Sequence, residues 1–285
     1  MKKNIIYLIL ILFSTFLNAN EKIVLQLKWF HQFQFAGYYA AKEKGFYDEV
    51  GLNVEIRQRD LKYNNIDEVI NGNAQYGVAD SILILYRLKQ QPVVIVSPIF
   101  QHSPSVFISL KKSNISSVYE LNNKDILFYP NDTDGFSLLA MIKKFDLDVN
   151  LVRERYKDDY MRLINNEVDV MPAYIANEPF LFKEKGYDVN IINPTNYGFD
   201  MYGDMLFTNE DEAKNNPIRV EKFKEATLKG WKYALENKEE IIQLINEKYS
   251  KENIPLLAIN SMDTFLYEDE TLKLMKKKVD KFKFS

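Results

Sequence analysis

The feature that most constrains the fold of this chain is a repeated alternation of short β-rich runs with longer helical runs. The expected strands are 23–27, 53–57, 76–78, 93–99, 106–110, 126–129, 150–153, 168–171 and 189–192. The expected helices are 36–44, 66–71, 82–89, 135–144, 159–165, 178–185, 218–235, 238–249 and 262–282. Such alternation is typical of βαβ units, whose largely parallel sheet is covered by helices on both faces. The pattern therefore predicts an α/β fold.

Two series of strands and helices followed by a helical tail can form either one long sheet or two lobes. Pro194, Gly198 and Gly203 follow the second series and indicate a place where the chain crosses back toward the first. A crossing of this kind would leave a cleft between two lobes, where α/β proteins commonly bind ligands. The periodicity alone leaves both arrangements open.

The first twenty residues have the pattern of a secretory signal peptide. Lys2 and Lys3 precede an apolar run from Ile5 to Phe13, and Leu17 and Ala19 suit a leader peptidase. The apolar run is shorter than the roughly 20 residues that a membrane-spanning helix requires. We expect the leader to be cleaved and the mature chain to reside in the periplasm, with retention as an uncleaved anchor as the alternative.

Composition excludes several classes of function. The chain has no cysteine, so it forms no disulfide, thiolate metal site or cysteine nucleophile. Removal of the leader leaves 35 basic against 40 acidic residues, a balance that argues against nucleic acid as a partner. A P-loop, GxSxG, HExxH and a dinucleotide-binding GxGxxG are all missing. We therefore expect a protein that is not an enzyme and that holds no metal and no cofactor.

An aromatic cluster follows the first expected strand, at the sheet edge where ligands of α/β proteins bind. Trp29 and His31 are candidate ligand-binding residues, because an indole on a turn is costly to leave exposed unless it stacks on a flat partner. Tyr38 and Tyr39 differ by about 100 degrees around the next helix, so only one can face the ligand. We choose Tyr38, and expect the two phenylalanines between His31 and Tyr38 to belong to the core.

A second candidate set lies where the strand 168–171 gives way to a helix. Tyr174 provides a stacking face, and Asn177 and Glu178 provide hydrogen-bonding groups suited to a planar amine or amidine. A structural alternative is equally open, in which Asn177 caps the helix and Glu178 complements its dipole.

The remaining candidates are polar residues at strand ends and at the expected crossing. Asp80 and Ser81 end a strand, His102 ends the next, and Asp200 and Tyr202 lie between two glycines that suit a hinge. Each could instead be an ordinary cap or turn residue. Taken together they form a possible ligand-binding rim.

Five segments resemble one protein family in consistent order and spacing, from about residue 23 to 235. They are "LQLKWFHQFQFAGYYAAKEKGFYDEVGLNVEI", "VINGNAQYGVADSILIL", "PVVIVSPIFQHSPSVFISL", "VDVMPAYIANEPF" and "YGFDMYGDMLFT". The chain is similar to periplasmic substrate-binding proteins of ABC importers in the thiamine-pyrimidine-precursor (hydroxymethylpyrimidine) branch, which are related to the sulfonate and nitrate binders. The resemblance implies a type II periplasmic binding protein fold, with two α/β lobes closing on one ligand. It places the first lobe at about 21–108 and 203–285 and the second at 109–202.

The resemblance also implies roles for individual residues. Aromatic faces, here Trp29 and Tyr174, would sandwich an aminopyrimidine, while the carboxylates of Glu178 and Asp200 would read its amino and ring nitrogens. It implies a monomer that hands its ligand to an ABC permease, with a link to thiamine biosynthesis.

Two other functions share the same resemblance. The segment "KWFHQFQFAGYYAA" is also similar to sensor modules, so the chain could be a free-standing sensory protein that signals to a membrane receptor. A pyrimidine synthase of the same superfamily would require a cysteine-rich motif and a lysine for pyridoxal phosphate, for which Lys28 is the early candidate. The missing cysteines and the leader argue against this enzyme.

Overall fold

The computed structural model describes residues 20–130, 134–153 and 160–249. The expected signal peptide and the expected helix 262–282 therefore lie outside the described residues. Across the three described ranges, no helix combines the length and the apolar character needed to cross a membrane.

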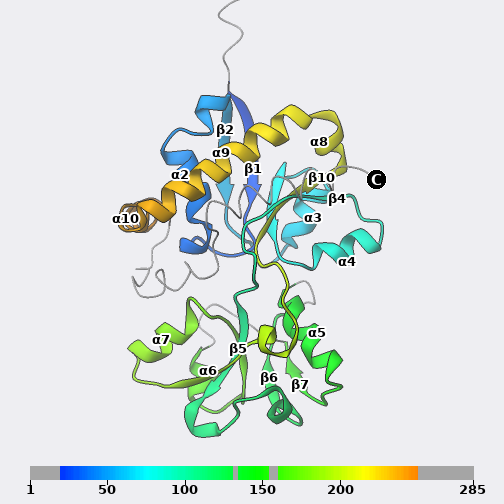
Figure 1. Ribbon diagram of the computed structural model, residues 1–285, viewed down its shortest axis with the longest axis vertical. Helices are drawn as coiled ribbons and strands as arrows, with labels where there is room; N and C mark the ends of the chain where they lie inside the picture. The colour runs from blue at the N-terminus through cyan, green and yellow to red at the C-terminus, as the bar shows by residue number, and fades with distance from the viewer. Residues whose placement is uncertain (1–19, 131–133, 154–159, 250–285) are drawn as a thin grey trace, which may run out of the picture.

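A five-stranded sheet forms the centre of what we call the first lobe (Figure 1). Its strands, in spatial order, are β2 (Leu52–Arg57), β1 (Glu21–Gln26), β3 (Tyr76–Ala79), β10 (Met205–Asn209) and β4 (Val93–Pro98). β1 is parallel to its neighbours β2 and β3, whereas β10 runs antiparallel to β3 and β4. Residues on β2 alternate between buried and exposed, as expected where helices cover one face.

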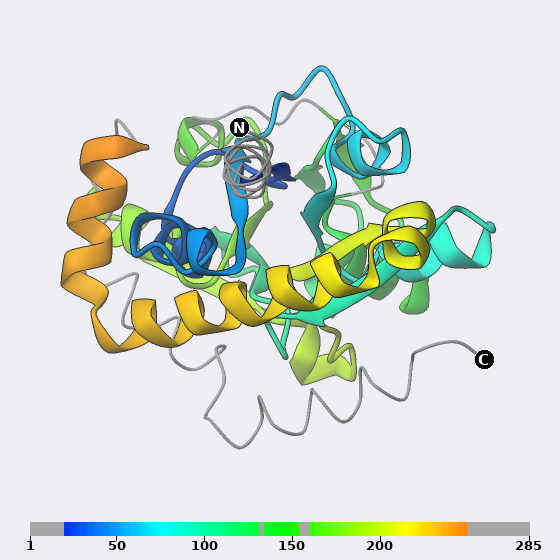
Figure 2. The same ribbon diagram turned by 90° about the horizontal axis from the view of Figure 1, so that it is seen from above.

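Among the residues that the structure describes, six α-helices and two short 3-10 helices belong to the first lobe. They are η1 (Phe33–Phe35), α2 (Ala36–Glu43), η2 (Asp48–Val50), α3 (Asn65–Ile70), α4 (Leu83–Leu88), α8 (Glu210–Asn215), α9 (Pro217–Glu236) and α10 (Lys238–Lys248). Seen from above, α9 runs diagonally across the lobe and α10 turns away at its end (Figure 2). Pro217 begins α9, where a missing N–H costs no hydrogen bond.

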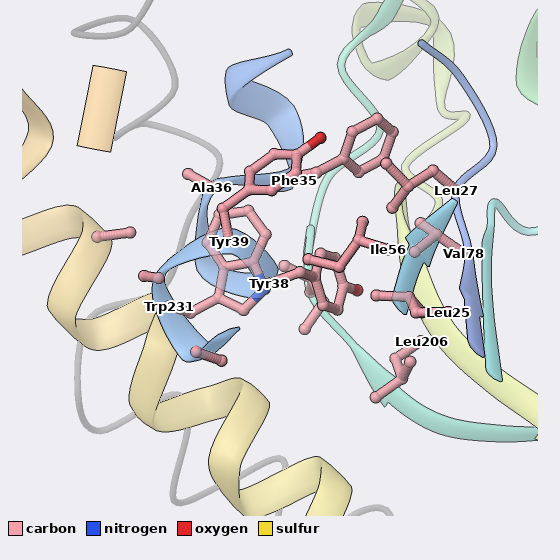
Figure 3. Packing of buried hydrophobic residues seen from close by; sticks show 14 of the residues in the cluster. Leu25, Leu27, Phe35, Ala36, Tyr38, Tyr39, Ile56, Val78, Leu206 and Trp231 are labelled. Carbon is pink, nitrogen blue, oxygen red and sulfur yellow. The ribbon is translucent and has the colours of Figure 1, made fainter. Parts of the chain in front are cut away.

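The crossing of α2 and α9 is unusually close because both helices carry a glycine there. A Cβ atom on Gly37 would lie 2.1 Å from the Trp231 ring, and one on Gly230 would lie 2.2 Å from the Gly37 carbonyl oxygen. The Tyr38 ring meets Trp231 edge-on, with centroids 5.8 Å apart, in the core that Figure 3 shows. Small residues at the contact therefore allow the aromatic core of the first lobe to close.

The second lobe contains the remaining strands (Figure 1). These strands are β5 (Ser105–Leu110), β6 (Asp125–Leu127), β7 (Asn150–Val152), β8 (Met171–Tyr174) and β9 (Val189–Ile192). Its helices are η3 (Lys111–Ser113), η4 (Val118–Leu121), α5 (Phe136–Lys144), α6 (Tyr160–Ile164), α7 (Glu178–Glu184) and η5 (Pro194–Tyr197). β5 lies between β8 and β9 and is antiparallel to both, while β6 and β7 pair in parallel. An isolated parallel bridge from Ile126 to Val170 links the two small sheets.

Two segments cross between the lobes, one from β4 to β5 and one from η5 to β10 (Figure 1). The expected first lobe ended at residue 108, whereas β5 already pairs with β8 from Ser105. We propose that the lobes divide near residues 99–104 and 198–204.

Most expected strands and helices are confirmed to within one or two residues at each end. Three expectations were wrong. The strand expected at 168–171 lies at β8, with Pro172 paired to Phe107, and the expected parallel sheet is antiparallel around β5. β10 and α8 were missed, and the hinge expected around Asp200 and Tyr202 ends where β10 begins. The antiparallel pairing of β5 and β10 arises because each strand enters its sheet from the opposite lobe, which reverses its direction relative to the βαβ units.

Candidate functional site

A buried lysine lies where the two lobes meet. Lys28 follows β1 by two residues, and its side chain is only 9% exposed. Its ammonium donates to the Tyr174 hydroxyl at 2.9 Å and lies 3.2 Å from Asp204 Oδ1 and 3.5 Å from Asp80 Oδ2. Three acceptors match the three N–H donors of an ammonium. One residue thus connects β1, β3 and β10 of the first lobe with β8 of the second.

The protonation states in this cluster follow from burial and from the neighbouring charges. Burial alone would lower the pKa of the Lys28 ammonium, but Tyr174, Asp204 and Asp80 together hold that pKa well above its ordinary value. Burial raises the pKa of the Tyr174 phenol well above its ordinary range, and the Asp204 charge adds to the effect. Lys28 is therefore charged and Tyr174 neutral at neutral pH, and the phenol donates onward to Asp204 Oδ1 at 3.0 Å.

The two carboxylates of the cluster have further partners within the first lobe. Asp204 is 1% exposed, and its Oδ2 accepts from the Gln34 side chain at 2.9 Å. Asp80 accepts from the backbone N–H of Ile82 at 3.0 Å at the start of α4. Both acids are thus held in place by the lobe that carries Lys28, before the second lobe adds its phenol.

A second polar contact joins the lobes beside the first. The Arg59 guanidinium forms two hydrogen bonds with the Asp134 carboxylate, at 3.3 and 3.4 Å. Arg59 also donates to Asn65 Oδ1 at 2.7 Å and to the Lys28 carbonyl at 3.2 Å. Burial raises the pKa of Asp134 above its ordinary value, although the charges of Arg59 and Lys28 act to lower it. The Arg59–Asp134 ion pair is linked to the Lys28 cluster, because Arg59 donates to the Lys28 carbonyl.

Trp29 provides an aromatic surface next to both polar contacts. Its ring is partly buried and packs against the cores of both lobes. It meets Tyr129 of the second lobe edge-on, with centroids 6.4 Å apart, and Phe30 at 5.3 Å. An indole at the lobe interface is suited to stacking on a flat ligand.

His31 and Tyr38, also expected to face the ligand, pack against aromatic residues of the first lobe. The half-buried His31 ring lies 2.8 Å from the Tyr39 hydroxyl, and burial and Lys42 lower its pKa. Tyr38 is 1% exposed and packs against Trp231 within the core of the first lobe. Its ring is a structural part of the α2–α9 crossing, because the turn of α2 directs it inward.

Ser81 lies next to Tyr202 of the crossing segment, and Asp80 belongs to the Lys28 cluster. The Ser81 hydroxyl donates to the Tyr202 carbonyl at 2.6 Å, which ties the start of α4 to the crossing segment. The Tyr202 side chain is 38% exposed. Of the three, only Asp80 contacts the Lys28 cluster.

His102 and Asp200 form a separate pair on the two crossing segments. His102 Nδ1 lies 2.7 Å from Asp200 Oδ1, and both side chains are about half exposed. The pair joins the two segments, so the Asp200 carboxylate is engaged with an imidazole in this conformation.

At the start of α7 the structure favours a supporting role for Glu178 over a ligand contact. Glu178 Oε2 accepts from the Tyr174 backbone N–H at 2.7 Å and so holds the end of β8 in position. Asn177 is exposed at the N-terminus of α7, where its side chain forms no capping hydrogen bond. The alternative in which the Asn177 side chain caps the helix was therefore wrong. The Tyr174 hydroxyl points into the Lys28 cluster.

Although Lys28 was considered as the lysine of a pyridoxal enzyme, five residues of the interface were not predicted from the sequence to bind the ligand. They are Lys28, Gln34, Arg59, Asp134 and Asp204. Lys28 and Arg59 could have been found by position. Lys28 follows β1 and Arg59 follows β2, and these neighbouring parallel strands end at the same edge of the sheet. Asp204 and Gln34 carry no comparable local pattern, since their partners are distant in the sequence.

The arrangement is suited to binding. It combines a flat aromatic ring with buried donors and acceptors from both lobes, which together can hold and orient a small planar polar molecule.

Solved structures with low sequence identity share this fold. The periplasmic aliphatic sulphonate binding protein SsuA from Escherichia coli superposes with a TM-score of 0.66 at 14% identity, covering 92% of this chain and 91% of that one. The alkanesulfonate-binding protein SsuA from Xanthomonas axonopodis pv. citri, bound to MOPS, gives 0.67 at 13% identity with 92% of each chain covered. The expected α/β periplasmic binding protein fold is thereby confirmed.

Two curated relatives are similar in sequence. The formylaminopyrimidine-binding protein of Halalkalibacterium halodurans is 23% identical over 92% of this chain and 79% of its own length. The riboflavin-binding protein RibY of Chloroflexus aurantiacus is 26% identical over 79% of this chain, which spans 65% of that relative. The family model described as "NMT1/THI5 like" matches residues 32–241, a range that runs from the turn after β1 into α10. The chain belongs to the NMT1/THI5-like family.

Proposed function

We propose that this chain is an exported solute-binding protein that captures a small planar nitrogen heterocycle and delivers it to an ABC-type importer. The observation that carries the proposal is the convergence of Trp29, the Lys28 cluster and the Arg59–Asp134 pair where the lobes meet. Aromatic surface supplies affinity and buried polar groups supply orientation. The relatives and structural neighbours above are named as binding proteins, which favours binding over catalysis.

We further propose that the ligand is a pyrimidine precursor of thiamine. The relative named for formylaminopyrimidine supports this choice, while the relative named for riboflavin makes a flavin the competing ligand. Both molecules are flat and carry ring nitrogens, so both could stack on Trp29 next to the Lys28 cluster. The proposed leader would place the mature protein in the periplasm, where it would act as a monomer and meet a membrane permease.

Tryptophan fluorescence can test the proposal, because the chain has two tryptophans in different settings. Trp231 is 4% exposed in the core of the first lobe, whereas Trp29 lies at the lobe interface. Titration of a Trp231→Phe variant with hydroxymethylpyrimidine should change the Trp29 emission in a saturable manner. The matched Trp29→Phe variant should show no change, because the buried Trp231 is remote from the ligand.

Mass spectrometry of small molecules that co-purify with the protein provides an independent test. A pyrimidine would support the proposed ligand, and a flavin would retain the binding function but change the ligand. A saturable response to neither compound, together with a co-purified molecule that lacks an aromatic heterocycle, would contradict the proposal.

A further inference from the structure

Lys28 occupies a position that a charged ligand group would otherwise take. Its ammonium lies between two carboxylates and a phenol, with distances of 3.2 Å to Asp204, 3.5 Å to Asp80 and 2.9 Å to Tyr174. A protonated amine or amidine entering between the lobes would seek the same three acceptors. In this chain those acceptors are already engaged by a side chain.

The neighbouring groups leave no second place for a cation in the cluster. Asp204 Oδ2 already accepts from Gln34, and Asp80 Oδ1 accepts from the Ile82 N–H. A ligand cation would also lie within a few ångströms of the Lys28 charge, in a site where Lys28 and Asp204 are almost fully buried. Like charges at such separations repel strongly when water is excluded.

The side chain is held so that it cannot easily withdraw. The Lys28 carbonyl accepts from Arg59, the ammonium lies 5.6 Å from the centroid of the Tyr174 ring, and its side chain is 9% exposed. Removing a buried ammonium from two carboxylates would leave both acids uncompensated. Lys28 is therefore a fixed element of the site.

We propose that Lys28 is a built-in counter-ion that makes this site selective for uncharged heterocycles over cationic ones. The inference rests on the proposed function, because it assigns the charge class of the ligand that the same site takes. It also implies that removal of the Lys28 charge would convert the site into one that attracts cations.

The test compares two probes of similar size and opposite charge class, neutral hydroxymethylpyrimidine and its ring-N-methylated cation. Their dissociation constants are measured by isothermal titration calorimetry for the wild-type full chain and for Lys28→Met. Wild type should bind the neutral probe and discriminate against the cation. Lys28→Met should gain affinity for the cation by about 1,000-fold, the size expected for loss of one like-charge contact at about 4 Å and an effective dielectric constant of about 20.

A second variant identifies the source of the gained affinity. In the double variant Lys28→Met/Asp204→Asn one carboxylate is neutralised, so most of the gain should be lost. Circular dichroism and urea unfolding verify that each variant folds, and Lys28→Gln replaces Lys28→Met if the latter does not.

Every outcome decides the inference. If wild type binds the neutral probe and Lys28→Met or Lys28→Gln gains no cation affinity, the inference is overturned while the proposed function stands. If wild type binds neither probe but the variant gains the cation, the inference is supported and the pyrimidine ligand is wrong. If no protein binds either probe, both are overturned.

Discussion

The two lobes contribute unequally to their shared interface. The first lobe supplies Lys28, Arg59, Asp80 and Asp204, and each of these is also held by a partner within that lobe. The second lobe supplies one phenol, one carboxylate and an aromatic edge. We propose from this difference that the first lobe carries a preorganised site, which the second lobe completes when the lobes close.

The largest expected effect concerns the interior of the first lobe. Gly230→Ala would place a Cβ 2.2 Å from the Gly37 carbonyl oxygen and 2.7 Å from the Ala41 nitrogen. Backbone atoms cannot move aside as a flexible side chain can, so we expect a loss of about 3 kcal/mol in the free energy of unfolding. Urea unfolding measures it, with Lys222→Ala on the exposed face of α9 as the control. If Gly230→Ala and Lys222→Ala had equal free energies of unfolding, α2 and α9 could move apart without loss of stability.

The next prediction compares the two residues of the Arg59–Asp134 ion pair. Arg59→Met removes contacts within the first lobe as well as the contact to Asp134, so we expect a loss of about 2 kcal/mol in unfolding free energy. Asp134→Asn leaves the bonds of Arg59 to Asn65 and Lys28 intact and should cost about half as much. Small-angle X-ray scattering should report a larger radius of gyration for both variants. A greater loss for Asp134→Asn would reverse the assigned roles of the lobes.

A smaller effect is expected for the phenol of the second lobe. Tyr174→Phe removes the bridge between Lys28 and Asp204, but their direct contact at 3.2 Å remains. The loss should be about 1 kcal/mol, typical of one hydrogen bond to a charged network. Urea unfolding and scattering provide the measurement, and Tyr187→Phe, at an exposed tyrosine of the same lobe, is the control. Identical values for the two variants would mean that the hydroxyl does not help to join the lobes.

The smallest expected effect is a pH dependence of stability at Glu210, a residue far from the lobe interface. Hydrogen bonds from Lys214 and Arg87 lower the pKa of Glu210 to about 2 from an ordinary value of 4.5. A lowered carboxylate pKa contributes stability that is present above pH 4.5 and is lost as the pH falls toward 2. Glu210→Gln should therefore melt slightly below wild type at neutral pH and converge with it in acid, because exposed pairs contribute little. A difference in melting temperature that grows as the pH falls would contradict this assignment.

The fold was predictable where local pattern and packing agree. The bounds of β1, α2 and β2 differ from expectation by at most two residues, and β2 buries every second residue as its pattern predicts. β10 was not predictable in this way, because its strand conformation depends on pairing with β3 and β4. Its polar and glycine-containing approach from Asp200 is typical of a turn.

The site was predictable by region but less well by residue. Trp29, Asp80 and Tyr174 lie at the lobe interface, since each follows or ends a strand at the expected edge. His102 and Asp200, by contrast, pair with each other, a contact between residues 98 positions apart that no local pattern could indicate. Buried charge partners such as Asp204 are set by tertiary packing, which explains why sequence reasoning favoured aromatic and strand-end residues instead.

The position of β10 has a consequence for how the chain is made. This strand fills an interior place in the five-stranded sheet, between β3 and β4, yet it is synthesised after the whole of the second lobe. Until residue 209 has emerged, β3 and β4 lack the neighbour that joins them, and their edges remain unpaired. The second lobe, whose strands are contiguous in sequence, can fold first. A nascent chain should therefore acquire its charged cluster only after the second lobe and β10 have been synthesised.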